Sequence, residues 1–242
     1  QYDAVDGTKA FKATFIAPGL FEQTHHLCSI TAALEYYFLN PDEMKDMIKY
    51  LVDWEMELLD GILTNLKPDA IFHHDDWGSE KSTFMSPDMF AEFFLEPYKQ
   101  IYGFCKSKGV EIIIHHADSY AATLVPYMIE MGIDVWQGCM KSNDLPELIK
   151  KYGGKITFMG GIDNKMVDYP GWTREASTKA VHETLDVLDS PKYFIPCITQ
   201  GGPGSVYPGV YEVLTEEIDK YNEERFGIKR EEIDRLPLQL IF

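Results

Sequence analysis

Short apolar runs alternate with longer helical patterns along this chain, and this alternation strongly limits the folds that it can adopt. Between the runs, apolar residues recur three and four positions apart, which is typical of amphipathic helices. Strands that alternate with helices indicate βα units built around a parallel sheet. The six strand-like runs are residues 12–16, 69–72, 110–114, 134–136, 156–159 and 193–195.

Local signals predict where several helices begin. Asn40 before Pro41, and Ser86 before Pro87, are each typical of a capping residue followed by the first residue of a helix. Pro97 falls inside the second of these helical patterns, so we expect it to kink or interrupt that helix. Further helices are predicted over residues 121–131, 145–152, 173–188 and 210–224.

The alternation predicts an α/β fold, a TIM-type (β/α)8 barrel that forms a single domain over residues 1–242. Such a barrel has eight strands, whereas six are visible here and the chain begins with Gln1. We therefore expect the first βα units to be missing, so that the chain is roughly the carboxyl-terminal three quarters of a longer one. The alternative is an open doubly wound sheet. That fold would place a glycine-rich phosphate loop after its first strand, and residues 18–21 do not form one.

Charge and cysteine usage limit the partners of the chain. Its 22 basic and 39 acidic residues give a net charge of −17, which repels phosphate backbones and anionic lipid surfaces. The four cysteines are widely spaced, and no secretory leader or membrane-spanning stretch is visible. We expect a cytoplasmic protein that binds neither nucleic acid nor membranes. The apolar ending, residues 236–242, suggests packing against a second subunit in a homodimer or against the base of the barrel.

Six of the seven histidines occur as doublets, and two doublets directly follow apolar runs with acidic residues within three positions. Because side chains alternate between the two faces of a strand, one member of each doublet should point inward and the other away. Imidazoles beside carboxylates offer proton transfer or metal binding. The placement of the third doublet, residues 25–26, stays open. The candidate catalytic residues are His74, Asp75, Asp76, His116 and Asp118.

Four further residues are candidates for binding a substrate. Adjacent carboxylates such as Asp75 and Asp76 could equally cap a helix, and the nearby aromatic residues could simply fill the mouth of the barrel. Packing is the preferred interpretation for Trp136. The candidate substrate-binding residues are Trp77, Tyr120, Asp163 and Gln200.

Several stretches in order resemble the uroporphyrinogen decarboxylase superfamily, which includes cobalamin-dependent methyltransferases. They are His-Asp-Asp-Trp-Gly at 74–78 followed by Met-Ser-Pro at 85–87, Ile-His-His-Ala-Asp-Ser at 114–119, Met-Gly-Gly-Ile-Asp at 159–163, and Ile-Pro-Cys at 195–197 with Gly-Gly-Pro-Gly at 201–204. The resemblance spans about residues 70 to 210. It implies a barrel with a deep cleft at the carboxyl ends of the strands, and an amino-terminal portion that this chain lacks.

The resemblance also implies possible cofactors, and the chain departs from the family's zinc pattern. Zinc-dependent methyltransferases of this superfamily hold the metal through a His-x-Cys pair and a further cysteine after the last strand. Here Ala117 replaces the first cysteine, and Gln200 stands near the position of the last ligand. Imidazole and carboxylate are also acceptable zinc ligands. The candidate metal ligands are His115, His116 and Asp118.

The motif set looks most like members that demethylate methoxylated aromatic compounds. This resemblance implies transfer of a methyl group from a small donor to a corrinoid carried by a partner protein. An alkoxide or phenoxide is a poor leaving group, so the ether oxygen needs a general acid or a Lewis acid. Two alternatives stay open. One is a decarboxylase of a small carboxylic acid, and the other is a metal-dependent barrel hydrolase or a non-catalytic barrel.

Overall fold

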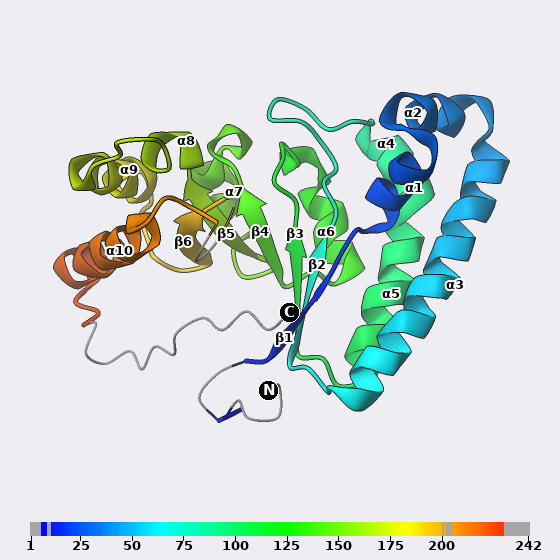
Figure 1. Ribbon diagram of the computed structural model, residues 1–242, viewed down its shortest axis with the longest axis horizontal. Helices are drawn as coiled ribbons and strands as arrows, with labels where there is room; N and C mark the ends of the chain where they lie inside the picture. The colour runs from blue at the N-terminus through cyan, green and yellow to red at the C-terminus, as the bar shows by residue number, and fades with distance from the viewer. Residues whose placement is uncertain (1–5, 9–10, 200, 202–204, 230–242) are drawn as a thin grey trace.

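Six parallel strands form one sheet in the computed structural model, in which residues 6–8, 11–199, 201 and 205–229 are described (Figure 1). Each strand pairs with the next along the chain. A doubly wound sheet would reverse its strand order at a switch point, whereas this order runs in one direction, as in part of a (β/α)8 barrel. The strands are β1 (Ala13–Ile16), β2 (Ala70–His74), β3 (Ile112–His116), β4 (Val135–Cys139), β5 (Thr157–Ile162) and β6 (Phe194–Ile198).

All six predicted strands are confirmed, although most begin and end later than the sequence indicated. β2 and β3 each extend through their histidine doublet, so the doublets occupy the last two positions of these strands instead of the loops after them. The side chains of the doublets are therefore fixed by the pleat of the sheet, because consecutive strand residues point to opposite faces.

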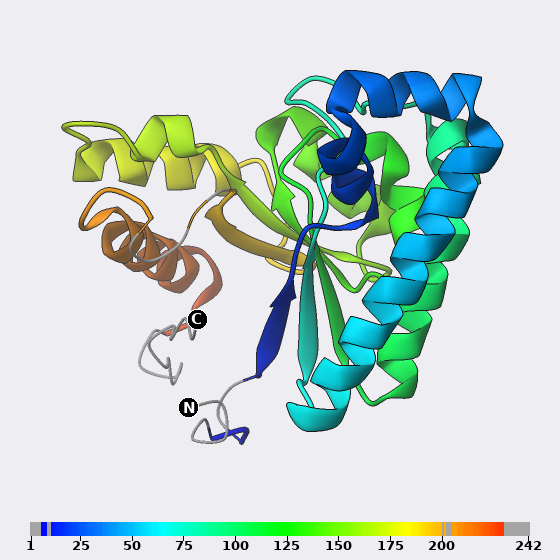
Figure 2. The same cartoon turned by 45° about the vertical axis from the view of Figure 1, so that its right-hand side comes forward.

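The helices follow the strands and cover the outer side of the sheet. Figures 1 and 2 show α3 and α5 side by side along β1, β2 and β3, and α9 packs against β5 and α10. Within the described residues, no helix combines the length and the apolar character needed to cross a membrane. The helices are α1 (Leu20–Cys28), α2 (Ile30–Leu39), α3 (Pro41–Asn65), α4 (Pro87–Phe90), α5 (Glu96–Ser107), α6 (Val125–Met131), α7 (Leu145–Tyr152), α8 (Asn164–Val167), α9 (Arg174–Leu185) and α10 (Val210–Phe226).

The predicted helix starts are confirmed, with one local difference. Ser86 caps α4 by accepting a hydrogen bond from the backbone N–H of Met89 at 3.2 Å, whereas the side chain of Asn40 makes no capping bond to α3. Pro97 interrupts the next helix as expected: a π-helical turn over Ala91–Leu95 separates α4 from α5. The sequence did not predict α1, α2 or α8, and α1 is where the His25-His26 doublet lies.

The two faces of the sheet differ in burial. Helix-facing side chains such as Ile71, Ile113 and Phe158 are fully buried in the core. Side chains of the opposite face are partly exposed, among them Ile114 and, on the edge strand β1, Phe15. The helix side therefore supplies most of the hydrophobic burial, and the inner face leaves its side chains accessible to a ligand.

Candidate active site

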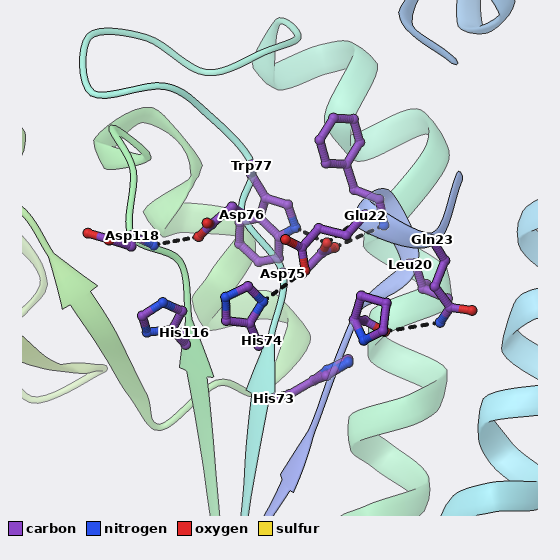
Figure 3. A network of polar contacts seen from close by, with 12 residues as sticks. Leu20, Glu22, Gln23, His73, His74, Asp75, Asp76, Trp77, His116 and Asp118 are labelled. Atoms are coloured by element: carbon purple, nitrogen blue, oxygen red, sulfur yellow. Dashed lines mark hydrogen bonds and ion pairs between the residues drawn. The ribbon is translucent and has the colours of Figure 1, made fainter. Parts of the chain in front are cut away.

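The two histidine doublets pair with each other across β2 and β3. In the register of the strands, His73 lies opposite His115 and His74 lies opposite His116. His73 and His115 are buried on the helix side, where both contact the Tyr102 hydroxyl of α5. His74 and His116 are half-buried on the inner face (Figure 3). The rings of His74 and His116 stack with centroids 4.6 Å apart and planes inclined by 18°. This arrangement is the alternation that the sequence predicted.

Asp76 joins the inner pair of imidazoles. His74, Asp76 and His116 each offer one ligand atom, and these atoms lie within 4.8 Å of one another. The backbone N–H of Asp118 donates a hydrogen bond to Asp76 Oδ1 at 2.6 Å, which holds the carboxylate over the imidazoles. The structure therefore brings together three of the five predicted catalytic side chains. It places Asp118 beside them through its backbone, and Figure 3 shows the Asp118 carboxylate pointing away from Asp76.

Two residues that the sequence analysis missed orient the imidazoles. Glu22 on α1 accepts a hydrogen bond from His74 Nδ1, with the Oε2 atom 2.8 Å away. The side-chain oxygen of Gln137 on β4 makes a short hydrogen bond with His116 Nδ1. Because both partners are acceptors, they assign the Nδ1 proton to each ring and leave each Nε2 available. Gln137 could have been found as a polar residue in an apolar strand, whereas no local signal marks Glu22.

The surroundings of His74 and His116 shift the pKa values of the two rings in opposite directions. The hydrogen bond to the Glu22 carboxylate raises the pKa of His74, and it outweighs the effect of partial burial. Burial lowers the pKa of His116, although the bond to Gln137 opposes this shift. His74 therefore keeps a second proton to higher pH than His116 does. Two neighbouring groups with opposite shifts are what an acid and a base at one site require.

Asp75 does not belong to this group, in contrast to the prediction. Its carboxylate is fully buried on the helix side, where it accepts hydrogen bonds from the backbone N–H groups of Phe21 and Glu22, from Trp77 Nε1 and from the Tyr98 hydroxyl. Burial raises the pKa of the Asp75 carboxyl to about 7, and these donors oppose that shift. Side-chain alternation explains the error, because Asp75 follows an inward-facing residue.

The predicted metal set is also wrong, because His115 and His116 point to opposite faces. His115 Nδ1 lies 2.8 Å from the Tyr102 hydroxyl, and its Nε2 donates to the carbonyl oxygen of Asp75 at 3.2 Å. Both ring nitrogens are therefore engaged on the helix side, away from His116. The set that the structure does bring together is His74, Asp76 and His116.

The predicted substrate-binding residues are mostly elsewhere. Trp77 is buried and stacks on His115 with ring centroids 4.0 Å apart, so it packs the core. Asp163 caps α8 by accepting from the backbone N–H of Lys165 at 2.9 Å. Tyr120 is half-buried, and its backbone N–H donates to the carbonyl of Ser79. Gln200 lies outside the described residues. Trp136 is buried, as its packing interpretation predicted.

The inner group fits a divalent cation as well as a proton. Two imidazoles and one carboxylate are a ligand set that catalytic zinc sites use, and each imidazole has an outer partner that fixes its orientation. Cys197 on β6 is not among the three residues whose ligand atoms lie within 4.8 Å of one another. Among the described residues, the donors that the structure brings together at this site are therefore imidazole and carboxylate.

Comparison with known proteins places the chain in a family. Residues 24–221 match the family described as Uroporphyrinogen decarboxylase (URO-D), and the chain belongs to this family. Among solved structures, it is similar to a methyltransferase from Methanosarcina mazei with a TM-score of 0.64 at 14% sequence identity. The match covers 86% of this chain and 58% of the methyltransferase, so the chain spans little more than half of that protein's length. The likeness shows a shared fold. No match was found among curated proteins.

Proposed function

We propose that this chain transfers a methyl group from a small methoxylated donor, of the aromatic kind, to a corrinoid carried by a partner protein. The observation that supports it most is the stacked imidazole pair, in which the hydrogen bond to Glu22 raises the pKa of His74 while burial lowers that of His116. The family and the fold are compatible with this activity.

The chemistry assigns each residue a role. The carbon–oxygen bond of the donor breaks as the methyl carbon bonds to the corrinoid acceptor, and the electron pair of the broken bond stays on oxygen. His74 gives its Nε2 proton to that oxygen, so the leaving group departs as a neutral alcohol or phenol. General acid assistance of this kind contributes about two to four powers of ten. His116 and Asp76 accept hydrogen bonds from the donor or the product, and Glu22 stabilises the charge of His74.

Aromatic surface beside the imidazoles supports an aromatic donor. The ring of Phe72 lies 6.0 Å from that of His116, and the ring of Phe15 lies 5.7 Å from that of Phe72. Phe15 is 61% exposed, so its face is open to a ligand. Stacked aromatic pairs are worth about 0.5–1.5 kcal/mol beyond the area that they bury. A methoxylated ring could lie on this surface with its ether oxygen toward His74.

A metal ion is a second way to assist the leaving group at the same atoms. His74, Asp76 and His116 would hold it, and a bound cation would act as a Lewis acid on the ether oxygen. A cation and the acidic proton compete for His74 Nε2. Metal content of protein purified without chelator, compared between the wild type and His116→Ala, separates the two. If the metal acts, it is stoichiometric in the wild type and lost in the variant, and chelation abolishes activity.

The decisive experiment mixes the protein with a reduced corrinoid protein and a panel of methoxylated aromatic compounds, and follows the loss of the Co(I) absorbance. We expect methyl transfer by the wild type and by His182→Gln, a control at an exposed histidine. We expect a loss of about 100-fold or more in His74→Gln. If no donor methylates the corrinoid while a carboxylic acid releases carbon dioxide, the chain is instead a decarboxylase.

A decarboxylase of a highly anionic substrate has less support. The partners of His74, Asp76 and His116 are carboxylates, imidazoles, an amide and a backbone N–H, and none within the described residues is a lysine or an arginine. The net charge of −17 also repels a polycarboxylate. A neutral ether is compatible with both observations.

A further inference from the structure

Helix α1 lacks a cap of its own and is capped by distant residues. Its N-cap residue is Gly19, which has no side chain to accept a hydrogen bond. The first backbone N–H groups of a helix need partners. Here the partners are Asp75, which directly follows β2, and Tyr98 on α5. Phe21 and Glu22 donate to the two carboxylate oxygens of Asp75 at 3.0 and 2.8 Å, and Leu20 donates to the Tyr98 hydroxyl at 3.0 Å.

The start of α1 also touches the end of β2 directly. The backbone N–H of Gly19 donates to the carbonyl of His74 at 2.7 Å. A Cβ atom on Gly19 would lie 2.4 Å from the Cβ of Asp75 and 2.9 Å from that carbonyl. There is no room for any larger residue, so the helix rests against the strand at the position that precedes Asp75.

The contact between the start of α1 and the end of β2 determines the position of Glu22. Glu22 is in the first turn of α1, and its backbone N–H donates to Asp75 while its carboxylate accepts from His74 Nδ1 (Figure 3). One residue thus connects the buried cap to the imidazole on the opposite face of β2. The Asp75 carboxylate is held in turn by Trp77 Nε1 at 2.9 Å and by the Tyr98 hydroxyl.

We propose that Asp75 is a positioning residue, which seats the amino terminus of α1 on β2 and so holds Glu22 in the place that fixes the tautomer and orientation of the His74 imidazole. The backbone N–H of Asp75 donates to the carbonyl of His116 at 3.0 Å, whereas its carboxylate bonds on the helix side to Phe21, Glu22, Trp77 and Tyr98 and acts on His74 through Glu22. The proposal rests on the proposed function only in taking His74 as the acid.

The test reads the tautomer of His74 and does not depend on activity. Protein labelled with ¹⁵N is kept with a chelator at a pH where the imidazoles are neutral, and long-range ¹H–¹⁵N correlations identify which ring nitrogen of His74 holds the proton. His74→Gln assigns the signals. The wild type should show the Nδ1–H form. Glu22→Ala removes the acceptor, and the Nε2–H form should appear.

Asp75→Asn and Gly19→Ala should change the His74 tautomer in the same direction as Glu22→Ala. The Asn amide turns one acceptor into a donor that faces the N–H groups of α1, and the Ala methyl pushes the helix off the strand. Gly103→Ala is the matched control, because a Cβ there meets nothing within 4 Å. In the double variant Asp75→Asn with Glu22→Ala, the tautomer should match that of Glu22→Ala alone, since both changes act on one contact.

Folded Asp75→Asn and Gly19→Ala proteins that keep the wild-type tautomer would overturn the proposal. Tyr98→Phe keeps the ring and removes the hydrogen bonds of the hydroxyl with Leu20 and Asp75. This variant tests the proposal if the Asn variant does not fold. It should increase the Nε2–H population of His74, and an unchanged tautomer in this variant also contradicts the proposal. Methyl transfer, measured in parallel, should fall about tenfold as outer partners are lost. An inactive wild type with the expected tautomer changes would refute the proposed function and leave this inference standing.

Discussion

The two faces of β2 and β3 carry the same dipeptide, His-His, yet they give its members opposite environments. His73 and His115 on the helix face are buried with 1% and 0% of their surface exposed, and burial lowers the pKa of His73 to about 3. His74 and His116 on the inner face are accessible and lie beside Asp76. The comparison shows that residue type and sequence position alone do not make a catalytic histidine. The face of the sheet on which a histidine lies determines whether it is accessible to a substrate.

The helix face forms a hydrogen-bonded chain whose direction can be assigned. A carbonyl only accepts, so His115 Nε2 must donate to Asp75, and His115 Nδ1 then accepts from the Tyr102 hydroxyl. That hydroxyl accepts in turn from His73 Nδ1 at 2.9 Å, which leaves His73 Nε2 without a proton, 3.2 Å from a carboxyl oxygen of Glu55. Within the described residues no hydrogen bond joins the two groups, and the buried Glu55 carboxyl favours its neutral acid form because it lacks a partner for the charge. Burial raises its pKa to about 8, in agreement with this assignment.

The largest difference between the two faces should appear when one histidine of each face is replaced. His116→Ala should lower methyl transfer by about 100-fold or more and change the free energy of unfolding by less than about 1 kcal/mol, because His116 is half-buried at the surface of the site. His115→Ala should destabilise the fold by about 2–4 kcal/mol, because the buried Tyr102 hydroxyl and Asp75 carbonyl lose a hydrogen-bond partner. The rate per folded molecule should stay nearly unchanged. Steady-state rates and urea unfolding measure both. Equal losses of activity in the two variants would contradict the assignment of the faces.

Two adjacent isoleucines of β3 offer a comparison without charge. Ile113 is fully buried against the helices, and Ile114 is partly exposed on the inner face. Ile113→Ala should cost about 2–5 kcal/mol of unfolding free energy, and Ile114→Ala roughly 1 kcal/mol because less apolar surface is buried there. Urea unfolding of both variants measures the difference. Similar costs would mean that the two faces are buried alike.

Tyr102→Phe tests the chain of hydrogen bonds on the helix face. The change removes one buried hydroxyl between His73 and His115, and it should destabilise the fold by about 1–3 kcal/mol. Methyl transfer should stay within about threefold of the wild type, a difference of less than 1 kcal/mol. A larger loss of activity than of stability would show that the helix-face chain takes part in the reaction.

The pH dependence of stability should reveal the neutral Glu55. Its native pKa of about 8 lies above the ordinary value of 4.5, so the native state keeps a proton that the unfolded state has lost. Stability from this group therefore falls as pH rises between these values, by about 1 kcal/mol from pH 7 to pH 8. The raised pKa of His74 and the pKa of Asp75, about 7, also contribute near this range, and both groups are kept in Glu55→Gln. Unfolding free energies of the wild type and Glu55→Gln at the two pH values provide the test.

Glu55→Gln cannot ionise at this position, so between pH 7 and pH 8 its stability should fall by about 1 kcal/mol less than that of the wild type. A variant that retains the wild-type slope would place the titrating group elsewhere. If Glu55 were instead an ion paired with a charged His73, the Gln variant would be strongly destabilised at both pH values.

Much of the fold followed from local patterns, and the exceptions have a physical cause. Apolar runs located all six strands, and the helix over Leu145–Tyr152 was predicted to the residue. Helix α1 was missed because its capping carboxylate, Asp75, lies 54 residues away from Phe21 in sequence. Helix α2 exposes apolar side chains such as Phe38 and Leu39, so it lacks the amphipathic pattern. The prediction of a homodimer through residues 236–242 lies outside the described residues and stays a prediction.

The sequence by itself determined the alternating strands and helices, the parallel sheet, and the fact that the two members of each histidine doublet must face opposite ways. Only the tertiary structure decided that His74 and His116 face inward, that Asp75 supports a helix, and that Glu22 and Gln137 orient the imidazoles. The reason is that an isolated strand has two equivalent faces. They become different only when helices distant in sequence bury one of them and leave the other open.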